Sequence, residues 1–300
     1  MQSNIVTIGV FDGLHLGHQE VIRQTVDYAR SIKTKSVLLT FKPHPQEVIT
    51  NRKVELITSY KQKKELIAKL EIDIYKELEF NPSFASLSAK GFIKEILVDK
   101  LKIKGLVLGI NYHFGKDEQG NVRLIQRLGK KYNFGVIIVP SVKIDEQVVS
   151  SSLIRSFIKQ GDFQQANKFL GRDRRICGEV FRDSERGRSL GYPTANLRYS
   201  PEILLPQGVF AAEIILNSTN EKKKGVVNIG KRPTFSPRAK EKNLEVHIFD
   251  FRKELYGDKI EVILRHRIRN EQRFFSKEEL VQQIKKDEQE AKKYFLKFGK

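Results

Sequence analysis

The pattern of apolar residues changes once along the chain, near residue 172, and no other feature constrains the fold as strongly. Before that point, short apolar runs predict buried strands at residues 5–10, 36–41, 74–77, 105–110 and 136–139. Amphipathic segments predict helices at residues 19–32, 61–70 and 88–99, and another from Ser152. Strands and helices that alternate in this way form βαβ units with parallel strands. We therefore predict an open α/β sheet with helices on both faces.

After residue 172 the apolar runs are shorter, and Gly, Pro and charged turns separate them. They predict strands at residues 178–181, 208–216, 225–229, 244–251 and 259–265. Such a series forms a small antiparallel barrel or sandwich. An amphipathic helix at residues 277–295 follows, with candidate packing positions at Leu280, Ile284, Ala291 and Phe295. We predict two domains, residues 1–172 and 173–300.

Charge and cysteine content narrow the class of protein. The net charge of +19 is spread over both halves and attracts polyanions, either nucleic acid or phosphorylated small molecules. No nucleic-acid-binding motif is recognisable, so we favour small molecules and expect Lys61, Lys63 and Lys64 on the solvated surface. The single cysteine, Cys177, forms no intramolecular disulfide. The sequence shows no recognisable signal peptide and no apolar run long enough to span a membrane. We therefore expect a cytoplasmic protein with no membrane segment.

The segment between the first predicted strand and helix, residues 9–18, has the sequence GVFDGLHLGH. His15 and His18 are three residues apart at a helix start, where free backbone N–H groups and the helix dipole favour an anion. Gly13 and Gly17 allow a phosphate to approach the backbone closely. Either histidine alone is also explained as a helix cap. Placed between a buried strand and an amphipathic helix, the segment predicts a phosphate-binding site.

Three further segments extend this pattern: FKPHP at residues 41–45, GINYHFGK at 109–116 and VSSSLIR at 149–155. The double proline predicts an extended turn that projects His44 over the sheet edge. Together with the histidine pair, these segments resemble the FMN adenylyltransferase module of prokaryotic FAD synthetases. Lys42 departs from that family, in which acidic residues are common at its position. His113 is explained equally well by ordinary turn chemistry.

The resemblance implies a Rossmann-like nucleotidyltransferase domain, with two histidines that stabilise charge at the α-phosphorus of ATP. The implied catalytic residues are His15 and His18. Those implied for ATP binding are Gly9, Phe11, Asp12, Gly13, Gly17, Ser151, Ser152 and Arg155, and those for flavin binding are Pro43, His44 and Asn111.

The second half contains GEVFRDSERGRSLGYPTAN at residues 178–196. Its basic groups, glycines and proline turn suit a polyphosphate. Thr194 and Asn196 alternate along the chain and direct two oxygen atoms the same way, as a Mg²⁺ ion requires. With LPQGVF at residues 205–210, NIGKRPTF at 228–235 and LEVHIFDF at 244–251, this segment resembles riboflavin kinases.

The second resemblance implies a riboflavin kinase-like barrel, with Glu245 as the general base that takes the proton of the flavin 5′-hydroxyl. An acidic residue among apolar strand positions costs free energy unless it is paired or functional, which favours this role. The implied ATP residues are Gly178, Arg188, Gly191 and Pro193, the implied Mg²⁺ ligands are Thr194 and Asn196, and the implied flavin residues are Arg269 and Glu271. Arg182 and Asp183 replace the usual His-Gly of the family, which leaves a weak or silent kinase as an alternative.

We expect an enzyme that uses ATP and Mg²⁺ to convert riboflavin to FMN and then FMN to FAD, with release of pyrophosphate. One alternative is an FMN adenylyltransferase alone. Another is a different His-x-Gly-His adenylyltransferase or cytidylyltransferase with an unrelated second domain. An RNA-binding protein or a flavin-sensing regulator without turnover would belong to another class. The sequence does not indicate the oligomeric state.

Overall fold

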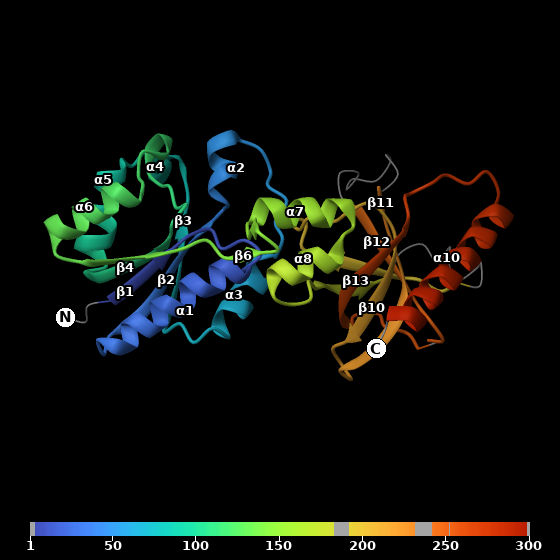
Figure 1. Ribbon diagram of the computed structural model, residues 1–300. Helices are drawn as coiled ribbons and strands as arrows, with labels where there is room; N and C mark the ends of the chain where they lie inside the picture. The colour runs from blue at the N-terminus through green and yellow to red at the C-terminus, as the bar shows by residue number, and fades with distance from the viewer. Residues whose placement is uncertain (1–3, 183–191, 232–241, 252, 299–300) are drawn as a thin grey trace. The chain divides into compact units, whose positions relative to one another are not determined.

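The computed structural model describes residues 4–182, 192–231, 242–251 and 253–298 (Figure 1). The chain divides into two compact units, Met1–Leu153 and Ile154–Lys300, and each is described by itself. Among the helices within these ranges, none has the length and apolar character of a membrane span.

A five-stranded parallel sheet forms the centre of the first unit. Its strands are β1 (Asn4–Ile8), β2 (Lys35–Lys42), β3 (Ile74–Glu79), β4 (Ile103–Gly109) and β5 (Gly135–Val139). They lie in the order β3-β2-β1-β4-β5, and every neighbouring pair is parallel. The predicted parallel sheet is confirmed.

Helices cover both faces of this sheet, as predicted (Figure 1). They are α1 (Leu16–Ser31), α2 (Pro45–Thr50), α3 (Tyr60–Ala68), α4 (Pro82–Ala85), α5 (Ala89–Gly91), the π-helical η1 (Phe92–Lys100), the 3₁₀ turn η2 (Lys116–Glu118) and α6 (Val122–Tyr132). On one face, Ile22 of α1 and Ile67 of α3 share a hydrophobic cluster with Leu38 of β2. On the other face, η1 and α6 cluster with Val6 of β1. Because neighbouring strand residues point to opposite faces, the sheet has a core on each side.

Some elements of this unit were not predicted, namely α2, α4, α6 and the hairpin of β6 (Lys143–Ile144) and β7 (Gln147–Val148). The double-proline segment, predicted as an extended turn, instead begins α2, with His44 as N-cap and Pro45 in the first turn. Proline suits that position because the first N–H groups of a helix have no partner within it.

The second unit contains a closed antiparallel barrel. Its strands are β8 (Ile176–Phe181), β9 (Ala195–Tyr199), β10 (Gly208–Leu216), β11 (Glu221–Lys231), β12 (Lys242–Ile248) and β13 (Lys259–Arg269). The order around the barrel is β10-β11-β12-β9-β8-β13. Five of these strands overlap predicted runs, whereas β9 was not predicted as a strand. The barrel is therefore confirmed, and the sandwich alternative is not.

In the described part of this unit, three helices accompany the barrel: α7 (Ser151–Gln160), α8 (Phe163–Leu170) and α10 (Lys277–Phe298). Phe163 belongs to the hydrophobic core of the barrel. In α10, Ala291 and Phe295 are buried against the outer face of the barrel, and Leu280 and Ile284 are half-buried. The terminal helix is confirmed, and of its four predicted packing positions Ala291 and Phe295 are buried in a hydrophobic cluster.

Candidate functional site

The strand order of the first unit indicates where a ligand binds. The chain moves outward from β1 to β2 and β3, then returns to the other side of β1 with β4 and β5. Open α/β sheets bind ligands at the carboxyl ends of their strands, beside such a switch point. The β1–α1 loop (residues 9–15) and the segment after β4 (residues 110–115) both begin there.

The β1–α1 loop has a strained conformation that its surroundings fix. Phe11, Gly13 and Leu14 have positive φ angles of 52°, 79° and 41°. Glycine adopts such an angle freely, but in Phe11 and Leu14 it persists only where neighbouring contacts impose it. One of these contacts is the buried Asp12 carboxylate, which accepts the backbone N–H of Ile57 at 3.0 Å. Asp12, predicted to bind ATP, thus supports the loop from within.

His15 and His18 lie together at the start of α1, as predicted. Their rings are stacked, with 3.6 Å between centroids and 18° between planes. His15 is the N-cap of α1, and its Nδ1 accepts the backbone N–H of His18 at 3.3 Å. A neutral His15 therefore carries its proton on Nε2, so the ring that caps the helix can still donate to an anion. A Cβ on Gly17 would lie 3.3 Å from the His15 ring.

The start of α7 is connected to the same loop. Ser151 Oγ donates to the backbone carbonyl of Asp12 at 2.9 Å, and Ser150 Oγ accepts the N–H of Leu153 at 3.3 Å. Ser152 is exposed. Arg155, one turn further along α7, belongs to the second compact unit. The structure thus joins Ser151 to the histidine segment, while its contact with ATP stays a prediction.

The predicted flavin residues of this unit have different surroundings. His44 is buried, and its Nδ1 accepts a backbone N–H as the cap of α2. Pro43 follows a cis peptide bond and is exposed. Asn111 Nδ2 donates to Ser141 Oγ at 3.3 Å. The Nδ1 atom of the exposed His113 lies 3.0 Å from the carbonyl oxygen of Asn111, which is the turn contact expected for it.

Lys63 was expected on the solvated surface, and this prediction is wrong. The side chain is only 3% exposed, and its Nζ donates to the Val10 carbonyl at 3.0 Å and to Thr40 Oγ1 at 2.9 Å. Burial lowers the pKa of Lys63 to about 8, because desolvation disfavours the ammonium form. Lys61 and Lys64 are exposed, as predicted.

Three polar residues form a row across the outer face of the barrel. In β12, Leu244 and Val246 belong to the interior core, so Glu245 faces outward. Glu245 lies opposite Asn196 of β9 and opposite Asn228 of β11. We call these three the outer-face row. The register brings the predicted base and a predicted Mg²⁺ ligand side by side and adds Asn228, to which sequence analysis gave no role.

Asn196 offers an acceptor that fits the predicted ion. The residue is 7% exposed, and within the described ranges no donor reaches its buried Oδ1. A buried polar atom without a partner costs free energy unless a bound ligand supplies the missing interaction. Mg²⁺ takes hard oxygen ligands of this kind. The preceding segment is anchored to β12, because His247 Nδ1 lies 2.9 Å from the Pro193 carbonyl oxygen.

Glu245 has a close neighbour on its own strand. Asn243 Nδ2 donates to Glu245 Oε1 at 2.6 Å. The predicted flavin residue Glu271 lies next to this pair, since a Cβ built on Gly230, opposite Asn243, would be 2.3 Å from Glu271 Oε1. Glycine at position 230 therefore leaves room for the carboxylate of Glu271.

Arg269, the other predicted flavin residue, forms an ion pair with Asp287 of α10. Its guanidinium donates to both carboxylate oxygens at 2.9, 3.1 and 2.8 Å, and Asp287 is 3% exposed. Gln283 Nε2 also donates to Asp287 Oδ1 at 2.8 Å. The ion pair fixes α10 to β13, where Arg269 lies opposite Val209 of β10.

Some predicted kinase residues lie outside the described residues, namely Arg188, Gly191 and Asp183. Arg182 is described, and its guanidinium lies 5.1 Å from the centroid of the Tyr256 ring. A Cβ on Gly178 would lie 2.6 Å from the carbonyl oxygen of Arg198 in β9. Close strand packing therefore explains Gly178 without a ligand.

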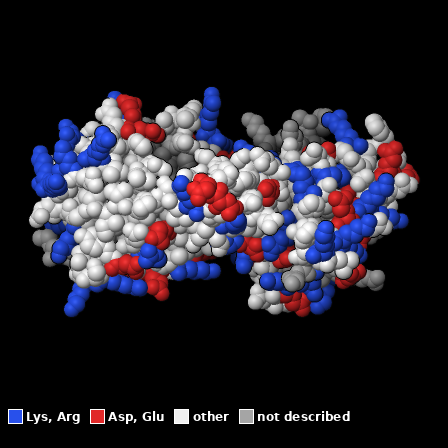
Figure 2. Space-filling model, viewed as in Figure 1, with Lys and Arg blue, Asp and Glu red and all other residues white. Residues whose placement is uncertain are grey.

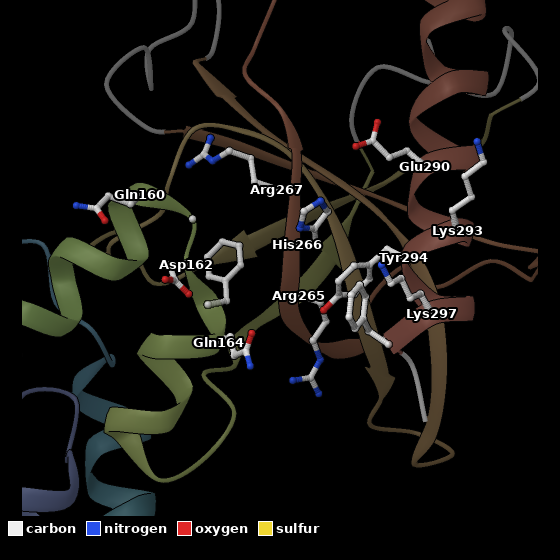
Figure 3. A pocket seen from close by; sticks show the side chains of 13 residues that line it. Gln160, Asp162, Gln164, Arg265, His266, Arg267, Glu290, Lys293, Tyr294 and Lys297 are labelled. Atoms are coloured by element: carbon white, nitrogen blue, oxygen red, sulfur yellow. The ribbon is translucent and has the colours of Figure 1, made fainter. Parts of the chain in front are cut away.

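The second unit also contains a cavity of about 620 Å³ between the α7–α8 turn, β13 and α10 (Figure 3). Its two guanidinium groups already have partners: Arg265 forms ion pairs with Asp173 and Glu213, and Arg267 donates to two backbone carbonyls. No member of the outer-face row lines this cavity. These two arginines thus serve the packing of the barrel.

The two sites share one kind of chemistry. A fixed loop with stacked histidines at a helix start suits phosphate groups, and a carboxylate beside an open oxygen ligand suits phosphoryl transfer to a hydroxyl. The fold and the sites therefore define a two-domain transferase that acts on nucleotide phosphates.

Comparisons with known proteins agree with this class. Residues 1–153 match the family model for FAD synthetase, and residues 170–295 match that for riboflavin kinase. Proteins named bifunctional riboflavin kinase/FMN adenylyltransferase from Buchnera aphidicola (subsp. Schizaphis graminum) and Escherichia coli K12 are 40% and 34% identical. These alignments cover 98% and 97% of this chain and 94% and 92% of the relatives. A solved structure described as a macrolide-efflux protein from Streptococcus pneumoniae is 31% identical, with a TM-score of 0.82, over 97% of this chain and 94% of that one.

The chain belongs to the family of bifunctional riboflavin kinases/FMN adenylyltransferases. It uses ATP to phosphorylate riboflavin to FMN and to adenylylate FMN to FAD. The riboflavin kinase match argues against an unrelated second domain, and the bifunctional relatives favour two activities over an adenylyltransferase alone.

Proposed function

We propose that riboflavin is phosphorylated at the outer-face row, with Glu245 as the general base. The 5′-hydroxyl oxygen of riboflavin attacks the γ-phosphorus of ATP, the bond to the β–γ bridging oxygen breaks, and ADP leaves. Glu245 takes the hydroxyl proton. The register that sets Glu245 opposite Asn196 carries this proposal. The hydrogen bond from Asn243 supports it, because it fixes the position of the Glu245 carboxyl group.

Thr194 and Asn196 hold the Mg²⁺ ion in this proposal. When bound, the ion neutralises charge on the polyphosphate. The Oδ1 atom of Asn196, which no donor reaches among the described residues, supports the assignment. Replacing Asn196 with Leu keeps the volume of the side chain and removes the acceptor. The variant is expected to need more Mg²⁺ for FMN formation, and an unchanged Mg²⁺ titration would contradict the assignment.

FMN is adenylylated, in the same proposal, at the β1–α1 loop. A phosphate oxygen of FMN attacks the α-phosphorus of ATP, the bond to the α–β bridging oxygen breaks, and pyrophosphate leaves. No proton has to be removed, so the protein contributes positioning and charge stabilisation. His15, His18 and the backbone N–H groups at the start of α1 supply donors, and Ser151 is hydrogen-bonded to the same loop. Asn111 and the turn at His44 hold the flavin.

Residues 1–172 form the adenylyltransferase domain and residues 173–300 the kinase domain of a cytoplasmic enzyme in this proposal. The boundary keeps Ser151, Ser152 and Arg155 with the β1–α1 loop, and Gly171 ends α8 directly before it with φ 68°. A fragment of residues 1–172 is expected to convert FMN to FAD. Loss of that activity in a folded fragment would move the boundary.

The positive charge serves the phosphates of ATP and FMN in this proposal, and nucleic acid is not a partner. Lys and Arg side chains are interspersed with Asp and Glu on the face that Figure 2 shows, which differs from one continuous basic stripe. Salt-dependent binding of RNA, measured together with an absence of turnover, would contradict this assignment.

One experiment tests both activities. Purified protein is incubated with ATP and Mg²⁺, with riboflavin in one tube and FMN in another, and the flavins are separated by chromatography. We expect FMN and FAD from riboflavin, and FAD from FMN. FAD from FMN alone would mean that the kinase half is silent, as the change at Arg182 and Asp183 suggested. No conversion in either tube would favour a flavin-binding regulator.

A further inference from the structure

The ammonium group of Lys63 closes a small hydrogen-bonded triangle at the carboxyl ends of β1 and β2. Its Nζ donates to the Val10 carbonyl at 3.0 Å and to Thr40 Oγ1 at 2.9 Å, and Thr40 Oγ1 donates to the same carbonyl at 3.0 Å. Hydrogen bonds from a charged donor are roughly twice as strong as neutral ones. The Val10 carbonyl is therefore a firmly held point at the base of the β1–α1 loop.

The burial of this charge requires an explanation. Removing an ammonium group from water costs free energy unless a partner compensates for it. Within the described ranges no carboxylate reaches ion-pair distance of Lys63 Nζ, and Asp12 and Glu77 favour its charge only from further away. A side chain such as Met would fill the same space without that cost. A costly buried charge at the edge of a binding site is a candidate for function.

We propose that Lys63 is a positioning residue for the triphosphate of ATP, a proposal that rests on the adenylyltransferase site described above. By holding the Val10 carbonyl, it fixes where the β1–α1 loop leaves the sheet, and so the arrangement of Phe11, Gly13 and His15 that follows. The same ammonium adds a fixed positive charge at the base of the loop, which favours ATP and the departing pyrophosphate. Lys63 thus acts in two ways, through the position of the loop and through its charge.

The charge of Lys63 gives FAD formation a pH signature. The groups that face it are Asp12 of the loop, Glu77 of β3, Lys42 at the end of β2 and the ring of Tyr60, whose centroid lies 5.2 Å from Nζ. Burial lowers the pKa of Lys63 to about 8, so raising the pH through this value removes the charge. The rate of FAD formation is expected to fall in that range.

Three variants of the full-length enzyme test the proposal: Lys63→Met, Lys63→Arg and, as a matched control, Lys64→Met on the exposed face of the same helix. We expect Lys63→Met to lower kcat/KM for ATP in FAD formation by about 10- to 100-fold, because a small displacement of positioning groups has effects of this size. Lys64→Met should leave it unchanged. Lys63→Arg retains the charge at all accessible pH, so the alkaline fall in activity should move to higher pH.

Riboflavin phosphorylation by the same molecules, together with thermal unfolding, shows whether each variant is folded. Wild-type kcat/KM in Lys63→Met, or an alkaline fall that stays near pH 8 in Lys63→Arg, overturns the proposal. If Lys63→Met does not fold, the pH profile of Lys63→Arg decides. A His15→Ala variant distinguishes failure of the site assignment from failure of the Lys63 proposal. If both His15→Ala and Lys63→Met form FAD normally, the assignment of the adenylyltransferase site is wrong. If His15→Ala is impaired and Lys63→Met is not, Lys63 has only a structural role.

Discussion

The β1–α1 loop and the outer-face row use different parts of the polypeptide. In the loop, the backbone itself is bent, with three positive φ angles, and Asp12 and Lys63 form hydrogen bonds that anchor it. In the outer-face row, the backbone is regular strand and the side chains of Glu245 and Asn196 stand out from it. A phosphate needs several donors that a bent backbone can gather. A proton transfer needs one basic atom in a fixed place, which a strand provides.

This difference predicts different sensitivities. FMN formation at the outer-face row should be lost when one side chain of the row changes and should tolerate changes elsewhere. The β1–α1 loop should respond also to residues that never touch ATP, because they hold its backbone. The kinase site makes FMN from riboflavin, and the adenylyltransferase site makes FAD from FMN. Both activities can therefore be measured separately in one protein sample.

The largest effect is expected for Glu245→Gln, which removes the base and keeps the shape. FMN formation should fall about 10²- to 10⁴-fold, the usual contribution of general base catalysis. FAD formation from added FMN should be unchanged, and both rates can be read by flavin chromatography. A kinase rate within twofold of wild type would refute Glu245 as base.

A somewhat smaller loss is expected for His15→Ala. Removing a donor that stabilises developing charge costs about 10²- to 10³-fold in rate, so FAD formation should fall to that extent while FMN formation continues. Because His15 also caps α1, the thermal unfolding of the variant must be measured. A similar loss in both activities would indicate general unfolding and would remove the contrast between the two sites.

Gly13→Ala tests the strained backbone without touching a polar group. The residue has φ 79°, and a Cβ would lie 2.9 Å from Ile57 Cδ1. We expect the free energy of unfolding of the first unit to fall by about 1–3 kcal/mol, as for other strained positions. Gly109→Ala is the control, because its nearest contact would be 3.9 Å away. Equal stability of the two variants would show that the loop is not constrained.

The smallest effect is a gain in stability for Lys63→Met. At pH 7 the buried ammonium opposes folding, so its replacement should raise the free energy of unfolding by about 1–2 kcal/mol. In the wild type the pKa is lowered from 10.5 to about 8, so the unfolded chain binds more protons between these values. Stability therefore rises with pH through that window. Denaturant titrations at pH 7 and pH 10 should show this rise in the wild type and a smaller one in Lys63→Met.

The pattern of apolar runs was enough to predict the parallel sheet and a second, antiparallel β-domain, because burial sets the period of a strand or helix. It left a barrel and a sandwich open, and the barrel was implied only by the resemblance to riboflavin kinases. The pattern was not enough for α2, where Pro45 begins a helix after a capping side chain. The strand β9 was missed for another reason: Asn196 and Arg198 interrupt the segment, so it does not stand out as an apolar run.

The candidate site was predicted best where residues are close in sequence, as with His15 and His18. One residue that joins the outer-face row through strand register was missed: Asn228 faces Glu245 only because β11 and β12 are paired in one register. Lys63 was hidden in a run of lysines, although its position four residues before the buried Ile67 places it on the inner face of α3. The helical spacing between Lys63 and Ile67 would have indicated that this lysine is buried.

The closure of the barrel has a consequence for the order in which the chain is made. The strand β8 has β9 on one side, and its other neighbour, β13, follows some eighty residues later, with Glu179 paired to Lys259. Until β13 leaves the ribosome, both β8 and β10 present an unpaired edge. The parallel sheet, by contrast, is complete once β5 has been synthesised. During translation the chain therefore acquires its FAD-forming half first, and a message shortened by its last forty codons would leave the FMN-forming half as an open, association-prone sheet.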